Sequence, residues 1–356
     1  MSREAIMDIF GNTGVEAILI TDPHNIRYCS GFRGGEGMVY ISPKQKVLIT
    51  DSRYTEAAAQ ESDFTIIEES HKHKRVQILH ELLAADQADI VGYEDHYMHC
   101  YEFSRLQNTL GEVKQWMPLE EQINRIRMIK TPEELDRIRM AESIGDKAFA
   151  GMMEILHPGM TEIEAAAELE YLLKINGGQR LSFDTIIASG KNSSMPHAIP
   201  TEKKLEAGDF VTMDFGCIYE GYCSDMTRTI VLGKASEKQR EIYDLVLSAQ
   251  EAALNGIHAG MTGNACDKLA RDVIVNAGYG SCFGHGLGHG VGLYIHEEPR
   301  FSPTDYNIIQ ENMVLSVEPG IYIPGFGGVR IEDLVIVRED GIENLAHAPK
   351  HLIELD

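Results

Sequence analysis

The sequence predicts a mixed α/β protein of two domains, the second of which contains two similar halves. Three observations support this prediction. The chain has 356 residues, which is more than one compact domain usually holds. Short apolar runs typical of strands alternate with segments of helical spacing. In the second part of the chain, one set of features occurs twice in the same order, as expected for an internal repeat.

Composition and charge exclude several classes of protein. Hydrophobic residues make up 43% and charged residues 24%, as in a globular protein. The formal net charge of −23 argues against binding to nucleic acid or to an anionic membrane, because both need basic patches. No apolar run approaches the length of a membrane span, and the N-terminus lacks the apolar region of a signal peptide. We therefore expect a cytoplasmic protein whose six cysteines, without a Cys-x-x-Cys pair, are reduced.

Residues 1–125 are predicted to form a small α/β domain. Five runs have the composition of strands, and residues 76–85 have the apolar spacing of a helix. The strand-like runs are 15–20, 38–41, 46–50, 64–67 and 89–93. The glycine-rich residues 34–37 do not follow the phosphate-loop pattern and are interpreted as a turn. This domain gathers no set of metal ligands.

A helix start marks the beginning of the second domain, residues 126–356. Thr131 is a good N-cap, Pro132 suits the first helical position, and Glu134 completes a capping box. The helix is expected to continue to about Leu156. Ser236 caps a further long helix that joins the two halves of this domain.

Each half begins with the same kind of segment. The stretch His157-Pro158-Gly159-Met160-Thr161 is echoed by His258-Ala259-Gly260-Met261-Thr262. An amphipathic helix follows each of them, expected over residues 162–176 in one half and 264–276 in the other. The repetition predicts a pseudo-two-fold domain with a site at the shared axis.

Each helix then leads to a segment that carries a histidine and to an apolar strand that ends in an acid. The first half supplies His197, Asp214 and, eleven residues later, Asp225. The second half supplies His289 and Glu318, and Glu332 follows Glu318 after fourteen residues. The four acids therefore occupy matched places in the two halves.

Glycine occupies every second position from Gly284 to Gly292. Since side chains alternate along a strand, these glycines would share one face, and the other face would carry His285 and His289. Glycine weakens a strand and usually marks a close backbone approach. His296 has the opposite parity, so a bend must intervene if it joins the other two. The alternative is a glycine-rich loop with incidental histidines.

The four acids and His289 point to bound cations. A carboxylate buried in an apolar run is costly unless it is paired or coordinates a metal. Four carboxylates and one imidazole form an oxygen-rich set that suits two divalent metals better than one catalytic zinc. A purely structural site would more often use cysteines.

Two further residues have less specific patterns. Arg330 lies two residues before Glu332, so both would share a strand face and the arginine could orient that acid; a plain salt bridge is the alternative. His197 lies in a segment typical of a loop, where a histidine alone is more often a surface or core residue than a catalyst.

Residues 285–297 resemble the signature of the pita-bread metallopeptidases, in the branch of prolidase and aminopeptidase P. The resemblance extends through Asp214-Phe215-Gly216, Ser224-Asp225-Met226-Thr227-Arg228-Thr229, Val317-Glu318-Pro319-Gly320 and Gly328-Val329-Arg330-Ile331-Glu332-Asp333. Residues 1–125 resemble the N-terminal domain of the same branch, so the resemblance covers essentially the whole chain. It implies that residues 126–356 form a catalytic pita-bread domain.

The resemblance also implies a role for each candidate residue. Asp225 and Glu332 would bridge two divalent metal ions, Asp214 would complete the shell of one metal, and His289 with Glu318 that of the other. Manganese is the implied metal, although cobalt, iron or zinc would fit the same ligands. His197 would handle the proton at the scissile nitrogen, His296 would contact the substrate carbonyl, His285 would line the proline pocket, and Arg330 is the implied active-site arginine.

The implied activity is that of an Xaa-Pro aminopeptidase, which cuts before a proline in second place of a proline-containing peptide. Asp51-Ser52-Arg53-Tyr54 resembles the aminopeptidase P side of the branch, and the chain resembles the short bacterial enzymes, with a homodimer expected. A prolidase restricted to dipeptides is the first alternative. A non-catalytic binding module, a metal-free creatinase-like hydrolase and a methionine aminopeptidase are the others. The retained five ligands argue against the module and the creatinase-like hydrolase, and the N-terminal domain argues against the methionine aminopeptidase.

Overall fold

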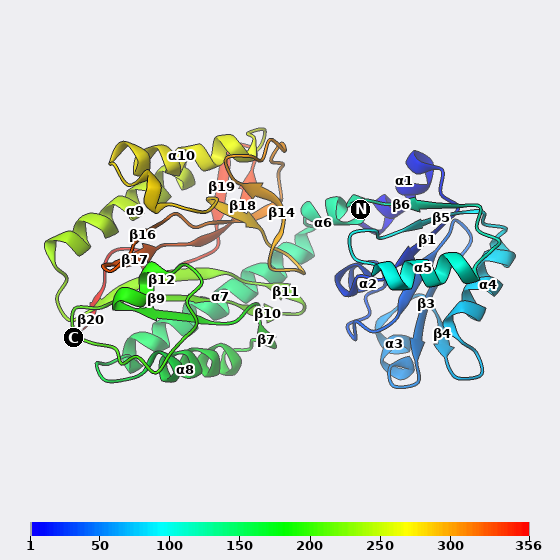
Figure 1. The fold of residues 1–356 in the computed structure, drawn as a ribbon, viewed down its shortest axis with the longest axis horizontal. Helices are drawn as coiled ribbons and strands as arrows, with labels where there is room; N and C mark the ends of the chain where they lie inside the picture. Colours follow the sequence, from blue (N-terminus) through cyan, green and yellow to red (C-terminus); the bar gives the residue numbers. More distant parts are fainter. Residues whose placement is uncertain (1, 356) are drawn as a thin grey trace. The chain divides into compact units, whose positions relative to one another are not determined.

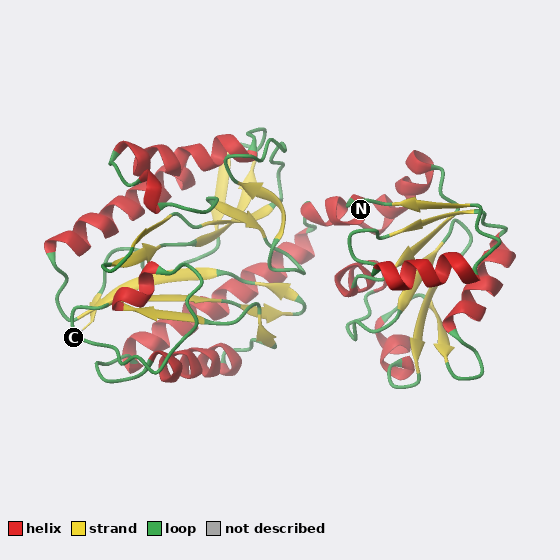
Figure 2. Ribbon diagram, viewed as in Figure 1, coloured by secondary structure: helices red, strands yellow, loops and turns green. Residues whose placement is uncertain are grey.

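A computed structural model describes residues 2–355 of the chain, which divides into two compact units, Met1–Arg127 and Met128–Asp356. Figures 1 and 2 show that each unit combines helices with sheet. The predicted α/β class is therefore confirmed. Among the described residues, no helix has both the length and the apolar character that crossing a bilayer requires.

The N-terminal unit is a mixed sheet with helices around it. Its elements are α1 (Ser2–Thr13), β1 (Ala17–Ile20), α2 (Pro23–Ser30), β2 (Met38–Ile41), β3 (Lys46–Asp51), α3 (Thr55–Glu61), β4 (Thr65–Glu69), α4 (Arg75–Asp86), β5 (Ile90–Tyr93), α5 (Cys100–Thr109), β6 (Gln115–Pro118) and α6 (Gln122–Met128), which crosses the unit boundary. The strand order is β4-β3-β2-β1-β5-β6, with β1–β2 and β2–β3 antiparallel. All five predicted strands and the predicted helix over 76–85 are present.

The first half of the C-terminal unit consists of α7 (Pro132–Ile155), α8 (Glu162–Ile175), β7 (Arg180–Leu181), β8 (Ile186–Ser189), the 3-10 turn η1 (Gly190–Ser194), β9 (Phe210–Phe215), β10 (Cys217–Tyr219), β11 (Tyr222–Cys223) and β12 (Met226–Leu232). Strands β8, β9 and β12 form one antiparallel sheet, to which β20 (Glu354–Leu355) adds in parallel beside β12. The side chains of α7 and α8 pack against β9 and β12 in one hydrophobic cluster.

The second half repeats this layout. Its elements are α9 (Glu237–Gly256), α10 (Gly263–Asn276), η2 (Gly280–Cys282), β13 (Gly288–Gly290), β14 (Glu297–Phe301), β15 (Val314–Val317), β16 (Gly320–Ile323), β17 (Gly327–Arg330), β18 (Asp333–Arg338) and β19 (Gly341–Asn344). The sheet order is β14-β13-β15-β18-β19, and α9 and α10 pack on this half in a second cluster. In Figure 1 the strands lie between α7 and α8 below and α9 and α10 above.

The predicted helix caps form as expected. The Thr131 hydroxyl accepts a hydrogen bond from the Glu134 amide at 3.3 Å, and the Glu134 carboxylate accepts one from the Thr131 amide at 2.7 Å. Ser236 caps α9 through the same reciprocal arrangement with Gln239. Polar side chains thus satisfy helix N-terminal amides at the places that the sequence indicated.

The repeated segments adopt the same conformation in both halves. Gly159 has φ +94° and Gly260 has φ +91°, a left-handed backbone that favours glycine. Each donates its amide over 2.8 Å to a later loop, Gly159 to the Leu205 carbonyl and Gly260 to that of Ile309. Thr161 and Thr262 then cap α8 and α10. The predicted pseudo-two-fold arrangement is present in these matched turns, helices and strands.

The glycine-rich stretch is a strand only over β13, and the chain bends after it. A Cβ on Gly288 would lie 1.9 Å from the Ser316 carbonyl oxygen, and one on Gly290 would lie 2.6 Å from that of Glu298. Neighbouring backbone therefore fills the space that side chains would need, as expected of glycines in a strand. The predicted strand was too long at both ends. Residues 283–287 before β13 are irregular, and after it a bulge follows His289 and irregular backbone leads to His296.

We predict that Gly288→Ala destabilises the C-terminal unit by about 1–3 kcal/mol or more, because its Cβ would overlap a strand carbonyl. Gly284→Ala is the matched control, since no atom lies within 4 Å of the corresponding Cβ, and we expect a change within about 0.5 kcal/mol. Urea unfolding in the presence of a chelator measures both. Equal stability of the two variants would contradict the close approach at Gly288.

Candidate metal centre

The predicted acids meet at the centre of the C-terminal unit because of strand parity. In β9, Val211, Met213 and Phe215 pack on the helices, so Asp214 projects to the opposite side. In β15, Leu315 and Val317 pack on the other helix layer, and Glu318 follows with the opposite parity. Both acids therefore point away from the helices and into a shared interior cavity.

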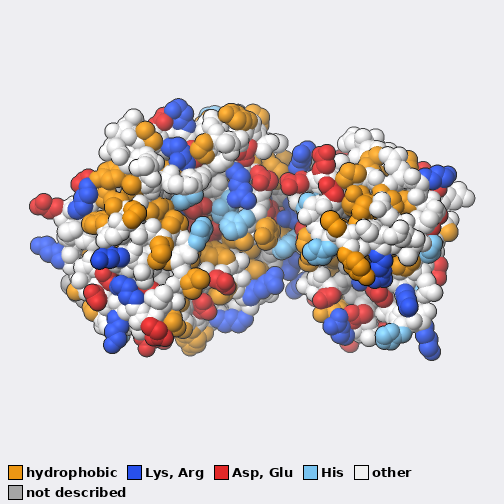
Figure 3. Space-filling model, viewed as in Figure 1, with side chains coloured by type: hydrophobic (Ala, Val, Ile, Leu, Met, Phe, Trp, Pro, Cys, Tyr) orange, Lys and Arg blue, Asp and Glu red, His pale blue; other side chains and the backbone are white. Residues whose placement is uncertain are grey.

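That cavity has a volume of about 1130 Å³ and is lined by all the sequence-predicted site residues. They are Asp214, Asp225, Glu318, Glu332, His197, His285, His289, His296 and Arg330. Figure 3 shows histidine side chains, in pale blue, gathered on this face of the larger unit. Residues far apart in the sequence are thus brought to one place by the two sheets.

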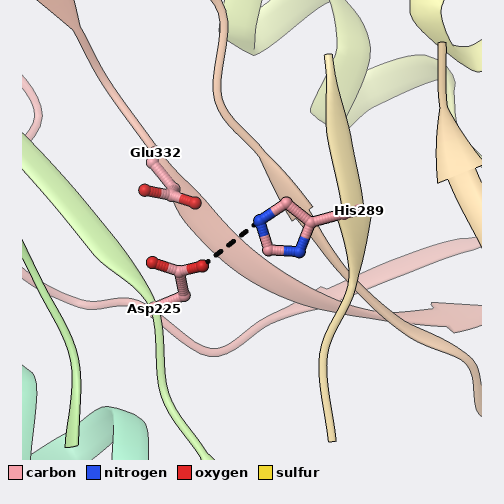
Figure 4. A group of neighbouring side chains, drawn as sticks. All are labelled: Asp225, His289 and Glu332. Atoms are coloured by element: carbon pink, nitrogen blue, oxygen red, sulfur yellow. Dashed lines mark ion pairs between the residues drawn. The ribbon is translucent and has the colours of Figure 1, made fainter. Parts of the chain in front are cut away.

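Asp225, His289 and Glu332 form the compact centre of the site. Figure 4 shows the three side chains pointing toward one another, and one donor atom from each lies within 4.8 Å of the others. Asp225 directly precedes β12, Glu332 directly precedes β18, and His289 is in β13. All three are buried, with 8% or less of each residue exposed. The first half of the unit supplies one member and the second half supplies two.

The His289 ring presents an unprotonated nitrogen to this centre. Its Nδ1 lies 3.1 Å from the Gly290 carbonyl, which can only accept, so Nδ1 carries the proton. Nε2 then faces Asp225 Oδ2 and Glu318 Oε1, each at 3.5 Å. Burial lowers the pKa of His289 to about 3, which favours the neutral ring. A lone pair and two carboxylates that face one another form an electron-rich set suited to a cation.

The carboxylates repel one another in the absence of a cation. Burial, with Glu332 and Asp214 as like-charged neighbours, raises the pKa of Asp225 well above its ordinary value. Burial also raises the pKa of Glu332 well above its ordinary range, with Glu318 contributing, and that of Glu318 to about 7. Desolvation and like-charge repulsion both disfavour the ionised forms. A bound divalent cation would compensate both effects.

Asp214 has one oxygen held by the protein and one free for a ligand. Its Oδ2 accepts a 2.6 Å hydrogen bond from Arg330 Nη2, whereas Oδ1 is buried and has no hydrogen-bond partner within residues 2–355. A buried carboxylate oxygen without a partner is rare. This orphaned atom, together with the donor chemistry of the centre, fits the binding of hard divalent cations.

Arg330 and Glu332 face the same cavity, as the shared-face expectation requires, but they do not belong to one strand. Arg330 ends β17, which pairs with β16, whereas Glu332 lies in the link to β18 in another sheet. Arg330 donates to Asp214 directly and is linked to Glu332 through the Thr227 hydroxyl, to which its Nε donates at 3.1 Å. Glu332 is held by Thr227, whose hydroxyl donates to Oε2 at 2.7 Å. The switch between sheets lies within two residues and leaves no trace in the apolar pattern.

Tyr322 is a site residue that sequence reasoning missed. Arg330 Nη1 donates to its hydroxyl at 2.7 Å, and that hydroxyl lies 3.0 Å from His285 Nε2. The His285 Nδ1 proton goes to the Gly286 carbonyl at 2.8 Å, so Tyr322 donates to Nε2. Burial lowers the pKa of His285 to about 4, in agreement with a neutral ring. The pairing of Gly320 with Arg330 places Tyr322 here, and no local motif indicates it.

His197 and His296 lie at the more open part of the cavity. Both side chains are exposed, unlike that of His289. His296 comes from the bend after β13, and its ring centroid lies 4.5 Å from that of His289. His197 follows η1 in a loop, as expected. Exposed imidazoles beside a buried acidic centre are suited to exchange protons with a molecule bound in the cavity.

Two family patterns match the chain. Residues 136–339 match metallopeptidase family M24, and residues 3–129 match the creatinase/prolidase N-terminal domain. The chain is similar to the Xaa-Pro dipeptidase of Pyrococcus furiosus, with 39% identity over 353 residues, 98% of this chain and 99% of that protein.

Solved structures show the same likeness in three dimensions. The Xaa-Pro dipeptidase from Bacillus anthracis superposes with a TM-score of 0.96 and 40% identity, over 99% of both chains. The X-Pro aminopeptidase from Thermotoga maritima gives a TM-score of 0.91 and 37% identity, over 96% of this chain and 97% of that one. The similarity therefore covers both units and is not restricted to the central site.

We predict that divalent cations stabilise the protein through the central acids. Manganese at a hundred times its Kd should raise the free energy of unfolding by about 2.7 kcal/mol. Asp225→Asn and Glu332→Gln should each lose this gain and bind less metal, because each removes a carboxylate of the central cluster. Glu206→Gln, at an exposed acid outside the cavity, is the control. Calorimetry with metal analysis checks this; full metal occupancy in either variant would show that the acid replaced in it does not hold the cations.

Proposed function

Since this chain belongs to metallopeptidase family M24 and is a hydrolase of that family, we propose that it hydrolyses the Xaa-Pro bond at the N-terminus of short peptides. The observation that carries the proposal is the buried cluster of Asp225, His289 and Glu332, at the base of a cavity large enough for a peptide end. The full-length similarity to Xaa-Pro peptidases supports the same activity.

The five central residues are the proposed ligands of two divalent cations. Asp225 and Glu332 would be shared, Asp214 would serve one cation through its free Oδ1, and His289 with Glu318 would serve the other. When bound, such cations activate water as a nucleophile and polarise the scissile carbonyl. Manganese is the proposed metal because the set is rich in hard oxygen donors. Arg330 holds Asp214 in place through its 2.6 Å hydrogen bond.

The exposed histidines supply proton transfer and substrate contacts. The departing proline nitrogen must gain a proton, and His197 is the proposed donor because it lines the cavity on a loop outside the ligand set. His296, beside His289, is proposed to contact the substrate carbonyl. His285, kept neutral by burial and oriented by Tyr322 and Gly286, forms a wall suited to the apolar proline ring.

The comparisons favour the dipeptidase alternative over the aminopeptidase interpretation of the sequence. The cavity offers a physical reason, because Arg300 also lines it with 41% of its side chain exposed. Its Nε lies 3.5 Å from Glu298 Oε1, a long contact that leaves donors available. A guanidinium there suits the carboxylate that a dipeptide carries on its proline.

The proposal extends to the compartment and the oligomeric state of the enzyme. All six cysteines, each within the described residues, are free, in agreement with a reducing cytoplasm. The resemblance of the N-terminal domain to one used for dimer contacts supports a homodimer.

We predict that His197→Ala lowers kcat by about 10²–10⁴-fold with an Xaa-Pro substrate, as expected for loss of a general acid. Metal content should be unchanged, because His197 lies outside the central cluster. His258→Ala, at an exposed histidine outside the cavity, is the control for histidine loss. Near-normal turnover of His197→Ala would rule out the assigned role.

We also predict the substrate preference. An Xaa-Pro dipeptide should be cleaved with kcat/KM about tenfold or more above that of an Xaa-Pro-Xaa tripeptide, because a charge-assisted hydrogen bond contributes about 1.5–3 kcal/mol. An N-acetylated dipeptide should not be cleaved, since it lacks the free amine that the acids and metals would bind. A preference for the tripeptide would restore the aminopeptidase interpretation. Equal cleavage of the acetylated peptide would exclude an exopeptidase.

A further inference from the structure

One buried carboxylate, that of Glu162, holds both ends of the loop that carries His197. Glu162 is the first residue of α8 and is fully buried. Its Oε1 accepts hydrogen bonds from the Ser189 amide at 2.7 Å and from the Ser189 hydroxyl at 2.8 Å. Its Oε2 accepts from the Thr201 amide at 3.0 Å and from the Thr201 hydroxyl at 2.6 Å. The loop from 189 to 201 is therefore closed at its base by a single side chain.

The interior of the loop is held as well. The Asn192 side chain donates through Nδ2 to both oxygens of Glu162, each at 3.1 Å. The Gly328 amide donates to the Ser193 hydroxyl at 2.9 Å, and Arg330 Nη1 donates to the Pro196 carbonyl at 3.3 Å. His197 follows this last anchor directly. Both ends of the loop are thus tied to α8 at its base, and the part near its tip is tied to the proposed active-site arginine.

In the second half of the unit, the corresponding segment is held by a different carboxylate. Gly263 stands where Glu162 does, and a Cβ there would lie 2.1 Å from the Arg300 carbonyl. The carboxylate comes instead from Asp305, which accepts from the Arg300 amide at 2.6 Å and from the Asn307 amide at 2.8 Å. In both halves a carboxylate orders a segment that lines the cavity. The recurrence indicates that the Glu162 contacts serve the segment and not only α8.

We infer that Glu162 is a positioning residue for His197, which sets the efficiency of the proton transfer through the loop it closes. This inference rests on the proposed function, in which His197 protonates the departing nitrogen. Glu162 lies at the far end of the loop from the reacting atoms and does not line the cavity. A general acid must lie within hydrogen-bond reach of its target, and a misplacement of about 1 Å can cost about a hundredfold in rate.

Glu162→Gln tests the inference with a side chain of the same size. The amide keeps one accepting oxygen, so it cannot satisfy the Ser189 and Thr201 amides together. We expect kcat to fall about tenfold to a hundredfold, with KM and metal content little changed. Glu164→Gln is the matched control, because Glu164 lies in the same helical turn, is exposed and bonds only within the cap of α8 among the contacts described. It should leave kcat near the original value.

A double-mutant cycle separates positioning from a general loss of stability. In a His197→Ala background, Glu162→Gln should cause almost no further fall in kcat, because the two residues act as a unit. A further fall equal to that in the original protein would overturn the inference.

Hydrogen exchange gives a readout that does not depend on activity. In Glu162→Gln, the amides of residues 189–201 should exchange at least tenfold faster than in the original protein, whereas Glu164→Gln should leave them unchanged. Unaltered exchange in Glu162→Gln would overturn the inference whatever the activity. If the protein cleaves no Xaa-Pro peptide, the proposed function fails, and the exchange data still decide whether Glu162 holds the loop.

Discussion

The burial of like-charged carboxylates beside a neutral imidazole is the constraint on which the C-terminal unit depends. Asp225, Glu318 and Glu332 all have pKa values raised by burial and by neighbouring carboxylates, Asp214 among them, while burial keeps His289 neutral. Such a cluster opposes folding unless a cation occupies it. The surrounding structure accordingly directs lone pairs inward, through the Gly290 carbonyl at His289 and the Thr227 hydroxyl at Glu332.

The two halves are joined behind this cluster by an arginine. Arg228 is buried in β12 of the first half and donates to the Thr227 and Glu332 carbonyls, at 2.9 and 2.5 Å. It also pairs with Asp333 of β18 at 2.8 Å. Truncating one partner of a buried pair usually leaves a costly unpaired charge. Arg228 therefore links the backbone of the two halves directly beside Glu332.

Much of the fold and of the acidic site could be predicted from the sequence, because the acids interrupt a regular apolar pattern. Asp214 and Glu318 stand at matched strand ends, and strand parity alone turns them away from the helices. Long-range pairing was not predictable in the same way. The change of sheet between Arg330 and Glu332, the role of Tyr322 and the closure of a loop by Glu162 depend on which strands and loops meet, and local spacing carries no signal for that.

The distribution of the central donors over the two halves has a consequence for the completeness of the site. Asp225 comes from the first half, whereas His289 and Glu332 come from the second, so a single half holds only part of the set. The set is therefore complete only where the two halves lie together. Within one chain the halves need not be identical: a carboxylate on the helix, Glu162, holds the cavity-lining segment in one half, and a carboxylate on a loop, Asp305, does so in the other.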